Sequence, residues 1–269
     1  TRAIMPNPNP IPPEHPPLRG SAPPNLYGFE DETGTPLVGG AAIIPLLELI
    51  EGHTYRHIGT GFFITSSGVF ATAKHVLLSA HDSGRPIFTW QLIPPNQWHI
   101  RPVLQIDCHD TADVAIGLSC PSLNEETGEE LVDVRTRLTI RPHTPGDVIA
   151  TFAYPSTIIE ATESGQILSF NPDFYEGRIV EYLSNGRDRV MLPGPCYRTD
   201  MVIHHGASGG PVAGPSGRVF GINSTGFDGT NDFYISRINE IFSLEIETGE
   251  SDSITIQQLV NEGAVTVDP

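Results

Sequence analysis

A turn of small residues around Ser208 is the clearest chemical signal in the sequence. Residues 206–211 read GASGGP. Glycine permits backbone conformations that other residues avoid, so this segment can fold tightly enough to aim two N–H groups at one point. Two such donors could stabilise an oxyanion that forms next to the serine. A serine used in this way needs a general base, and the chain offers ten histidines.

The order of residues along the chain selects among the possible serine chemistries. GASGG also satisfies the GxSxG nucleophile elbow of α/β-hydrolases, but that fold places its histidine after the serine. All ten histidines lie at or before His205, so the segment that follows Ser208 has none. The order His, Asp, Ser is that of chymotrypsin-like barrels. The base is therefore expected upstream of Ser208.

His75 and Asp113 are the predicted partners of this serine. His75 follows a run rich in β-branched and aromatic residues, GVFATAKHV, where the chain would leave a strand. Asp113 opens the apolar run DVAIG, so burial would hold its carboxylate against the imidazole N–H. Asp113 lies 38 residues after His75 and 95 residues before Ser208. Asp110 remains the alternative carboxylate.

The elements that must position these residues are short and rich in β-formers. Runs such as HIGTGFFIT, IFTWQLI and DVAIGLS are each bounded by Gly, Pro, Asn, Asp or Ser, which is typical of a sandwich or barrel. A second series of such runs follows an acidic loop at residues 125–130. We predict an all-β fold with a first barrel over residues 37–130 and a second over residues 131–269. One short helix is expected at residues 255–262, ended by Gly263.

Residues 1–36 differ from the rest of the chain. Nine of the 25 prolines lie between Pro6 and Pro24, and such a segment can neither sustain a helix nor donate a full strand ladder. It is predicted to be an extended N-terminal arm or linker. The alternatives are a strap across the barrels and a tether to a further domain or a regulator.

Charge and hydropathy exclude several partners. The chain has 15 Lys plus Arg against 32 Asp plus Glu, a formal net charge of -17, which repels nucleic acid and anionic lipid. Its most apolar stretch, residues 37–50, includes Pro45 and Glu48 and is too short to span a bilayer. We expect a protein or peptide substrate, with neither nucleic acid nor membrane as partner. The start of the chain has no apolar signal region, so a cytoplasmic location is expected, or a secreted or periplasmic one if a signal peptide has been removed.

The cysteines and acidic residues give no sign of a metal or cofactor. Cys108, Cys120 and Cys196 are odd in number and lack CxxC spacing, so they are predicted to be unpaired thiols. His109 lies close to Asp110 and Asp113, but the spacing follows no zinc pattern. Neither a metal nor a cofactor is predicted.

Three blocks of sequence resemble a known family. TGFFITSSGVFATAKHV, ADVAIGLS and TDMVIHHGASGGPVAGPSGRVFGIN are similar to the signature blocks of trypsin-like peptidases, closest to the bacterial HtrA-type branch. The resemblance covers roughly residues 57–245. It implies two six-stranded antiparallel barrels of the chymotrypsin type, with His75, Asp113 and Ser208 as the triad. It also implies an oxyanion hole formed by the N–H groups of Gly206 and Ser208.

The resemblance also suggests a substrate pocket and marks two departures from the family. The residues expected to contact substrate lie just before the serine and on the strand after it: Val202, Ile203, His205, Ser224, Thr225 and Gly226. Zymogen-activated trypsins place an aspartate where this chain has Ala207, so no trypsin-type activation step is expected. The PDZ domains of HtrA-type proteins are not found in this sequence.

The sequence thus predicts a serine endopeptidase that forms an acyl-enzyme on Ser208, with His75 as general base and Asp113 orienting it. Two alternatives stay open. The barrels could serve as a binding or sensing module that becomes active only with a partner. The same site could also act on esters, since acyl transfer does not require an amide.

Overall fold

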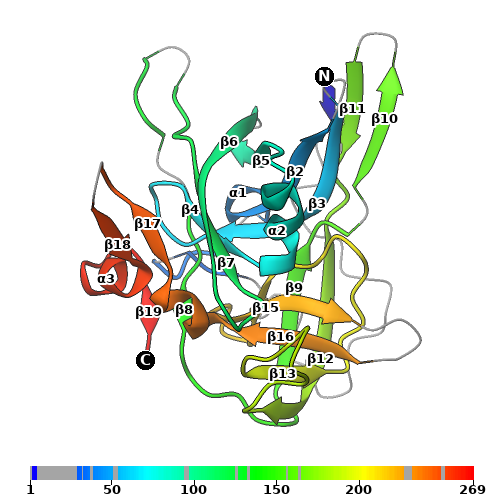
Figure 1. Cartoon of the computed structure of the whole chain (residues 1–269), viewed down its shortest axis with the longest axis vertical. Coiled ribbons are helices and arrows are strands. Elements are labelled where there is room, and N and C mark those ends of the chain that lie inside the picture. The colour runs from blue at the N-terminus through cyan, green and yellow to red at the C-terminus, as the bar shows by residue number, and fades with distance from the viewer. Residues whose placement is uncertain are drawn as a thin grey trace.

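The computed structural model describes most of the chain. The described residues are 2–4, 29–31, 33–36, 39–50, 54–93, 97–124, 127–131, 134–155, 157–162, 165–226, 232–249 and 252–269. Two closed β-barrels lie one above the other in Figure 1, with smaller elements around them. The predicted all-β fold of two six-stranded antiparallel barrels is confirmed.

The first barrel is built from the N-terminal half of the chain. Its strands follow one another around the barrel in the order β2 (Ile43–Ile50), β3 (Thr54–Phe63), β4 (Val69–Thr72), β7 (Ala115–Ser119), β6 (Gln97–Cys108) and β5 (Ile87–Ile93). Phe62, Phe63 and Phe70 are fully buried within it. The helix α2 (Lys74–Asp82) follows β4 directly and buries Val76 and Leu77. This helix was not predicted from the sequence.

The second barrel closes around strands from residue 148 onward. Its order is β14 (Pro211–Ala213), β9 (Val148–Ala153), β12 (Asp173–Leu183), β13 (Cys196–Thr199), β16 (Phe233–Arg237) and β15 (Val219–Gly226), and β14 pairs with β15 to complete the ring. Two short strands, β8 (Leu138–Thr139) and β19 (Val267–Asp268), extend the sheet from β15 in parallel. The predicted division at residue 130 falls between β7 and β8.

Smaller elements surround the two barrels. The short helix α1 (Gly39–Ala42) precedes β2, and the 3₁₀ helix η3 (Ile238–Ser243) follows β16. The strands β1 (Arg2–Ile4), β11 (Gly165–Ser169) and β10 (Ile158–Thr162) form one small sheet, and β17 (Glu245–Glu247) pairs with β18 (Ser253–Thr255). The predicted C-terminal helix is α3 (Ile256–Asn261), which begins at a capping box between Thr255 and Gln258.

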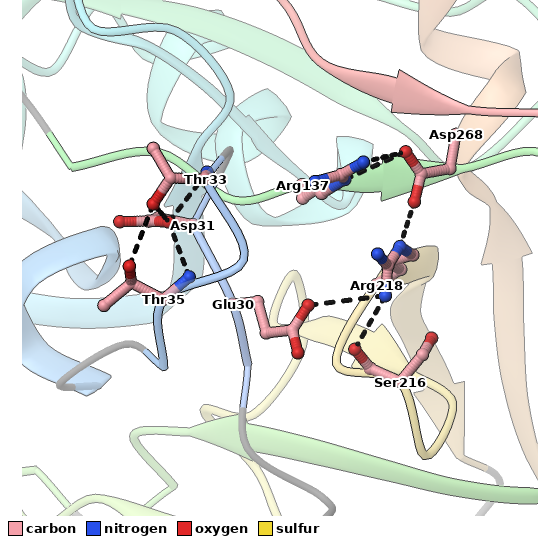
Figure 2. A network of polar contacts seen from close by, with 8 residues as sticks. All are labelled: Glu30, Asp31, Thr33, Thr35, Arg137, Ser216, Arg218 and Asp268. Atoms are coloured by element: carbon pink, nitrogen blue, oxygen red, sulfur yellow. Dashed lines mark hydrogen bonds and ion pairs between the residues drawn. The ribbon is translucent and has the colours of Figure 1, made fainter.

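The segment just before the first barrel is packed against the body of the protein. Phe29 is 5% exposed and belongs to the main hydrophobic core. Glu30 forms an ion pair with Arg218 at 3.3 Å, and Arg218 also donates to Asp268 near the C-terminus (Figure 2). Phe29 and Glu30, which we predicted to belong to the N-terminal arm, therefore contact the barrels. Residues 5–28 of the predicted arm lie outside the described residues.

Replacing Phe29 with alanine tests this packing. Loss of a buried phenylalanine removes apolar burial and leaves a cavity, so Phe29→Ala should lower the free energy of unfolding by about 3–5 kcal/mol in urea denaturation. Val190 is 84% exposed, and Val190→Ala should stay within about 0.5 kcal/mol of the unchanged protein. Equal stability of the two variants would show that Phe29 is not part of the core.

All three cysteines are free thiols in the structure, in keeping with the prediction. Burial raises the pKa of the Cys196 thiol to about 11, which keeps it protonated and unreactive near neutral pH. Among the described residues, no helix is both long and apolar enough to cross a membrane.

Candidate active site

His75 and Asp113 meet between the first barrel and its helix. His75 is the second residue of α2, which begins immediately after the buried strand β4. Its Nδ1 lies 2.9 Å from Oδ2 and 3.1 Å from Oδ1 of Asp113, and its backbone N–H donates to Oδ1 at 3.0 Å. A carboxylate only accepts hydrogen bonds, so Nδ1 carries the proton in the neutral ring. Nε2 is then left with its lone pair, as a general base requires.

Asp113 is held as a buried anion. It is 9% exposed and lies in the loop between β6 and β7. Burial alone would raise the pKa of this carboxyl group, but hydrogen bonds from His75 and Ser224, together with the attraction of His75 in its imidazolium form, bring the pKa below its usual value. Asp110, the alternative carboxylate, has no such contact, and its backbone carbonyl accepts from Lys74 at 3.3 Å. The structure thus brings Asp113 to His75.

The turn at Ser208 depends on a glycine with a left-handed conformation. Gly206 has φ of 89°, and a Cβ there would lie 2.9 Å from both the Tyr154 carbonyl oxygen and Cε1 of His57. Any larger residue would be strained and would crowd its neighbours. The first barrel fixes the turn from the other side: Thr60 donates from its hydroxyl to the Gly206 carbonyl and from its N–H to the Ser208 carbonyl, both at 2.8 Å.

Two backbone N–H groups in this turn are free to bind an oxyanion. The other three amides are used inside the structure, with Ala207, Gly209 and Gly210 donating to the carbonyls of His204, Asn223 and Ala207. Within the described part of the chain, the N–H groups of Gly206 and Ser208 have no acceptor. They are the two donors that the family resemblance implied. Because these two N–H groups donate to no other described group, they can stabilise negative charge that forms on a substrate oxygen.

The Ser208 hydroxyl is not yet bonded to the base. It donates to the Ser224 carbonyl at 3.0 Å, and within the described residues it makes no hydrogen bond with His75. His75 and Ser208 nevertheless line the same pocket. Hydrogen bonds between catalytic groups are often long or misaligned until substrate binds. The arrangement therefore holds the three side chains together with the serine turned away.

The residues predicted to contact substrate are placed in different ways. Ser224 is fully buried, and its hydroxyl donates to Oδ2 of Asp113, so its side chain supports the carboxylate instead of facing substrate. No local sequence pattern predicts this role, because it depends on contact between the two barrels. Val202 is 50% exposed, whereas Ile203 is 8% exposed and packs in the second barrel's core.

The other predicted substrate residues lie at the edges of the site. Thr225 is half-buried, and its hydroxyl donates to the Gly226 carbonyl at 3.1 Å. Gly226 lies against the ring of Phe233, which leaves no room for a side chain. His205 is exposed and lines the pocket that contains Ser208.

That pocket has a volume of about 700 Å³ and continues from Ser208 toward β3 and β10. His57, on β3, lines it and packs against Gly206. Burial lowers the pKa of His57 to about 4, partly offset by a hydrogen bond to the Gly59 backbone, so the ring is neutral near pH 7. Its Nε2 has no hydrogen-bond partner among the described residues. The described residues hold no cluster of three or more groups that could bind a metal ion.

Comparison with known proteins agrees with this geometry. The family model for the trypsin-like peptidase domain matches residues 59–222. The serine endoprotease DegS of Salmonella typhimurium (strain 14028s / SGSC 2262) is 27% identical over 177 residues, which make up 66% of this chain and 42% of that protein. The chain therefore spans less than half the length of this relative.

Solved structures are similar in fold. Deg5 superposes with a TM-score of 0.55 at 16% identity, covering 74% of this chain and 85% of that one. A mutant of Rv3671c from M. tuberculosis H37Rv, in an inactive form, superposes with a TM-score of 0.52 at 18% identity, covering 82% and 91%. At these identities the likeness concerns the fold alone.

Proposed function

The chain belongs to the trypsin-like peptidase family, as its three sequence blocks predicted, and on that premise we propose that it is a serine endopeptidase with Ser208 as nucleophile. One observation carries the proposal. His75 and Asp113 are hydrogen-bonded to each other beside the Ser208 turn, where two backbone N–H groups have no acceptor among the described residues and are available to an oxyanion. The family membership favours a peptide bond as the bond that is cleaved.

The site residues support the following proposed reaction. His75 accepts the Ser208 proton at Nε2 while Oγ attacks the scissile carbonyl carbon, and the N–H groups of Gly206 and Ser208 stabilise the negative oxygen. His75 then gives the proton to the leaving amine, which departs and leaves an acyl-enzyme. Water, deprotonated by His75, hydrolyses this ester and restores the serine. Asp113 stabilises the imidazolium in both half-reactions.

One observation favours a second candidate function. The Ser208 hydroxyl donates to the Ser224 carbonyl and not to His75, as in a site that still has to be completed. A binding or sensing module activated by a partner would show such a serine in its resting state. In this second candidate function the N-terminal arm is the tether for a regulator, since β1 pairs with β11 and Gln166 of β11 lines the active-site pocket. A cytoplasmic location for the protein remains a prediction.

A cleavage-site profile of the purified protein tests the endopeptidase proposal. We expect medium-sized aliphatic residues immediately before the cleaved bond, because Val202, Thr225 and Gly226 offer no charge to a side chain bound there, while Ile203 is buried in the core of the second barrel. Lys and Arg should be rejected, since a buried cation without a counter-ion costs several kcal/mol, whereas an added methylene gains only about 0.8 kcal/mol.

The profile should be measured at pH 6 and pH 8. An aliphatic pocket gives the same preferred residue at both values, whereas a histidine-lined pocket would favour Glu more strongly at pH 6. The structure favours the first result, because His205 lines the pocket toward β3 and His204 packs edge-on to Tyr175. Dominant cleavage after Arg or Lys would show that the pocket for the residue before the cleaved bond has been assigned to the wrong side chains.

A further inference from the structure

The pocket toward β3 lies on the leaving-group side of the proposed cleavage site. It contains Ser208 and Gly206, but none of Ser224, Thr225 and Gly226 lines it. Its other walls include β3 together with Pro155, Thr157 and Ile159. The family resemblance assigns substrate contact to Ser224–Gly226, and we place the acyl part of the substrate, before the scissile bond, along this segment. The residues that follow the scissile bond must then leave the nucleophile through this pocket.

The lining of this pocket has the opposite charge from the chain as a whole. Arg56 is the permanently charged residue among its described lining residues, and none of them is Asp or Glu. The chain as a whole carries 32 acidic against 15 basic residues. The positive charge in this pocket can attract an acidic ligand, although the net charge of the protein is negative and repels one.

Arg56 is the fixed charge in this lining, and a buried carboxylate holds it in place. Glu48 is 1% exposed on β2, directly opposite Arg56 on β3, and accepts hydrogen bonds from Arg56 and from Arg85, the latter at 3.2 Å. The three residues carry one negative and two positive charges, so one positive charge remains. The Arg56 side chain is 55% exposed, which leaves part of the guanidinium open to a ligand.

Arg85 completes the same ion-pair group but lies elsewhere. It lines a separate groove formed with β5, β6 and the β17–β18 hairpin. Arg85 is therefore a natural control for Arg56, since each arginine pairs with Glu48 and only Arg56 reaches the catalytic pocket. The neutral ring of His57 adds no charge to the pocket.

We propose that this pocket recognises an acidic side chain among the residues that follow the scissile bond, and that Arg56 determines this specificity. The inference rests on the proposed endopeptidase function. A glutamate entering the pocket meets the exposed part of the Arg56 guanidinium, and the described residues that line the pocket include no carboxylate. A lysine would place a second cation beside Arg56 without a counter-ion, so it is selected against.

The test measures a selectivity ratio with peptides that are identical except at one position. Each of the first three positions after the cleaved bond carries Glu, Gln or Lys in turn, and kcat/KM is measured for each peptide. At one of these positions we expect Glu to exceed Gln about fivefold, the size typical of a half-exposed charge pair, and Lys to be the poorest. The preference should shrink in 1 M NaCl, where exposed charges are screened.

Two matched variants then locate the charge. R56Q should bring the Glu-to-Gln ratio close to one, while R85Q should keep it, although each substitution removes one arginine from Glu48. The Glu-to-Gln ratio compares two peptides with the same variant, so a change in that variant's stability or overall activity affects both values equally and cancels. A ratio near one in the unchanged protein, or the same ratio in R56Q, would overturn the inference. Failure to cleave any peptide would instead contradict the endopeptidase proposal.

Discussion

Ser208→Ala should abolish peptide hydrolysis while leaving the fold intact. The hydroxyl is the proposed nucleophile, and alanine suits a turn already built from small residues, so kcat should fall by about 10⁶-fold. The measurement is peptide turnover alongside the melting temperature. Ser216, exposed in the turn between β14 and β15, supplies the matched control, and Ser216→Ala should keep full activity. Activity of Ser208→Ala within tenfold of the unchanged protein would remove Ser208 from the nucleophile role.

Asp113→Asn should cost about 10⁴-fold in kcat with little change in structure. The asparagine amide can donate to Nδ1 of His75, which moves the ring proton to Nε2 and blocks the base. The buried anion is also lost, so the imidazolium that forms during the reaction is no longer stabilised.

Asp110→Asn is the control for this substitution. Asp110 is exposed and makes no side-chain contact with His75 among the described residues, so its variant should keep activity within a few fold. The comparison uses kcat for the same peptide in both variants. A large loss in Asp110→Asn together with a small loss in Asp113→Asn would mean that the wrong carboxylate has been assigned.

Much of this site could be predicted because its signals are local. The tight turn at Ser208 needs small residues, and that need is visible in six consecutive letters of sequence. Asp113 could be preferred over Asp110 because it opens an apolar strand, and burial is what holds a carboxylate against an imidazole. The order of His75, Asp113 and Ser208 then excluded the α/β-hydrolase arrangement.

What could not be predicted depends on contacts between distant parts of the chain. The Ser224 hydroxyl donates a hydrogen bond to Asp113, which is 111 residues away in the chain, and no local pattern predicts that contact. Arg56 and Glu48 face each other only because β2 and β3 pair in one particular register. Phe29 follows a proline-rich segment, and only the packed structure shows that it belongs to the core. The helix that carries His75 begins without a side-chain cap, so its usual sequence signal was missing.

Labelling with a fluorophosphonate probe, followed by mass spectrometry of the peptides, tests the central claim most directly. The probe phosphonylates a serine only where a base and an oxyanion hole are already assembled around it. If the isolated protein is an active serine hydrolase, the label will be found on Ser208 and will be lost in both Ser208→Ala and His75→Ala. Absence of labelling in the isolated protein, or a label on another serine, would contradict the account.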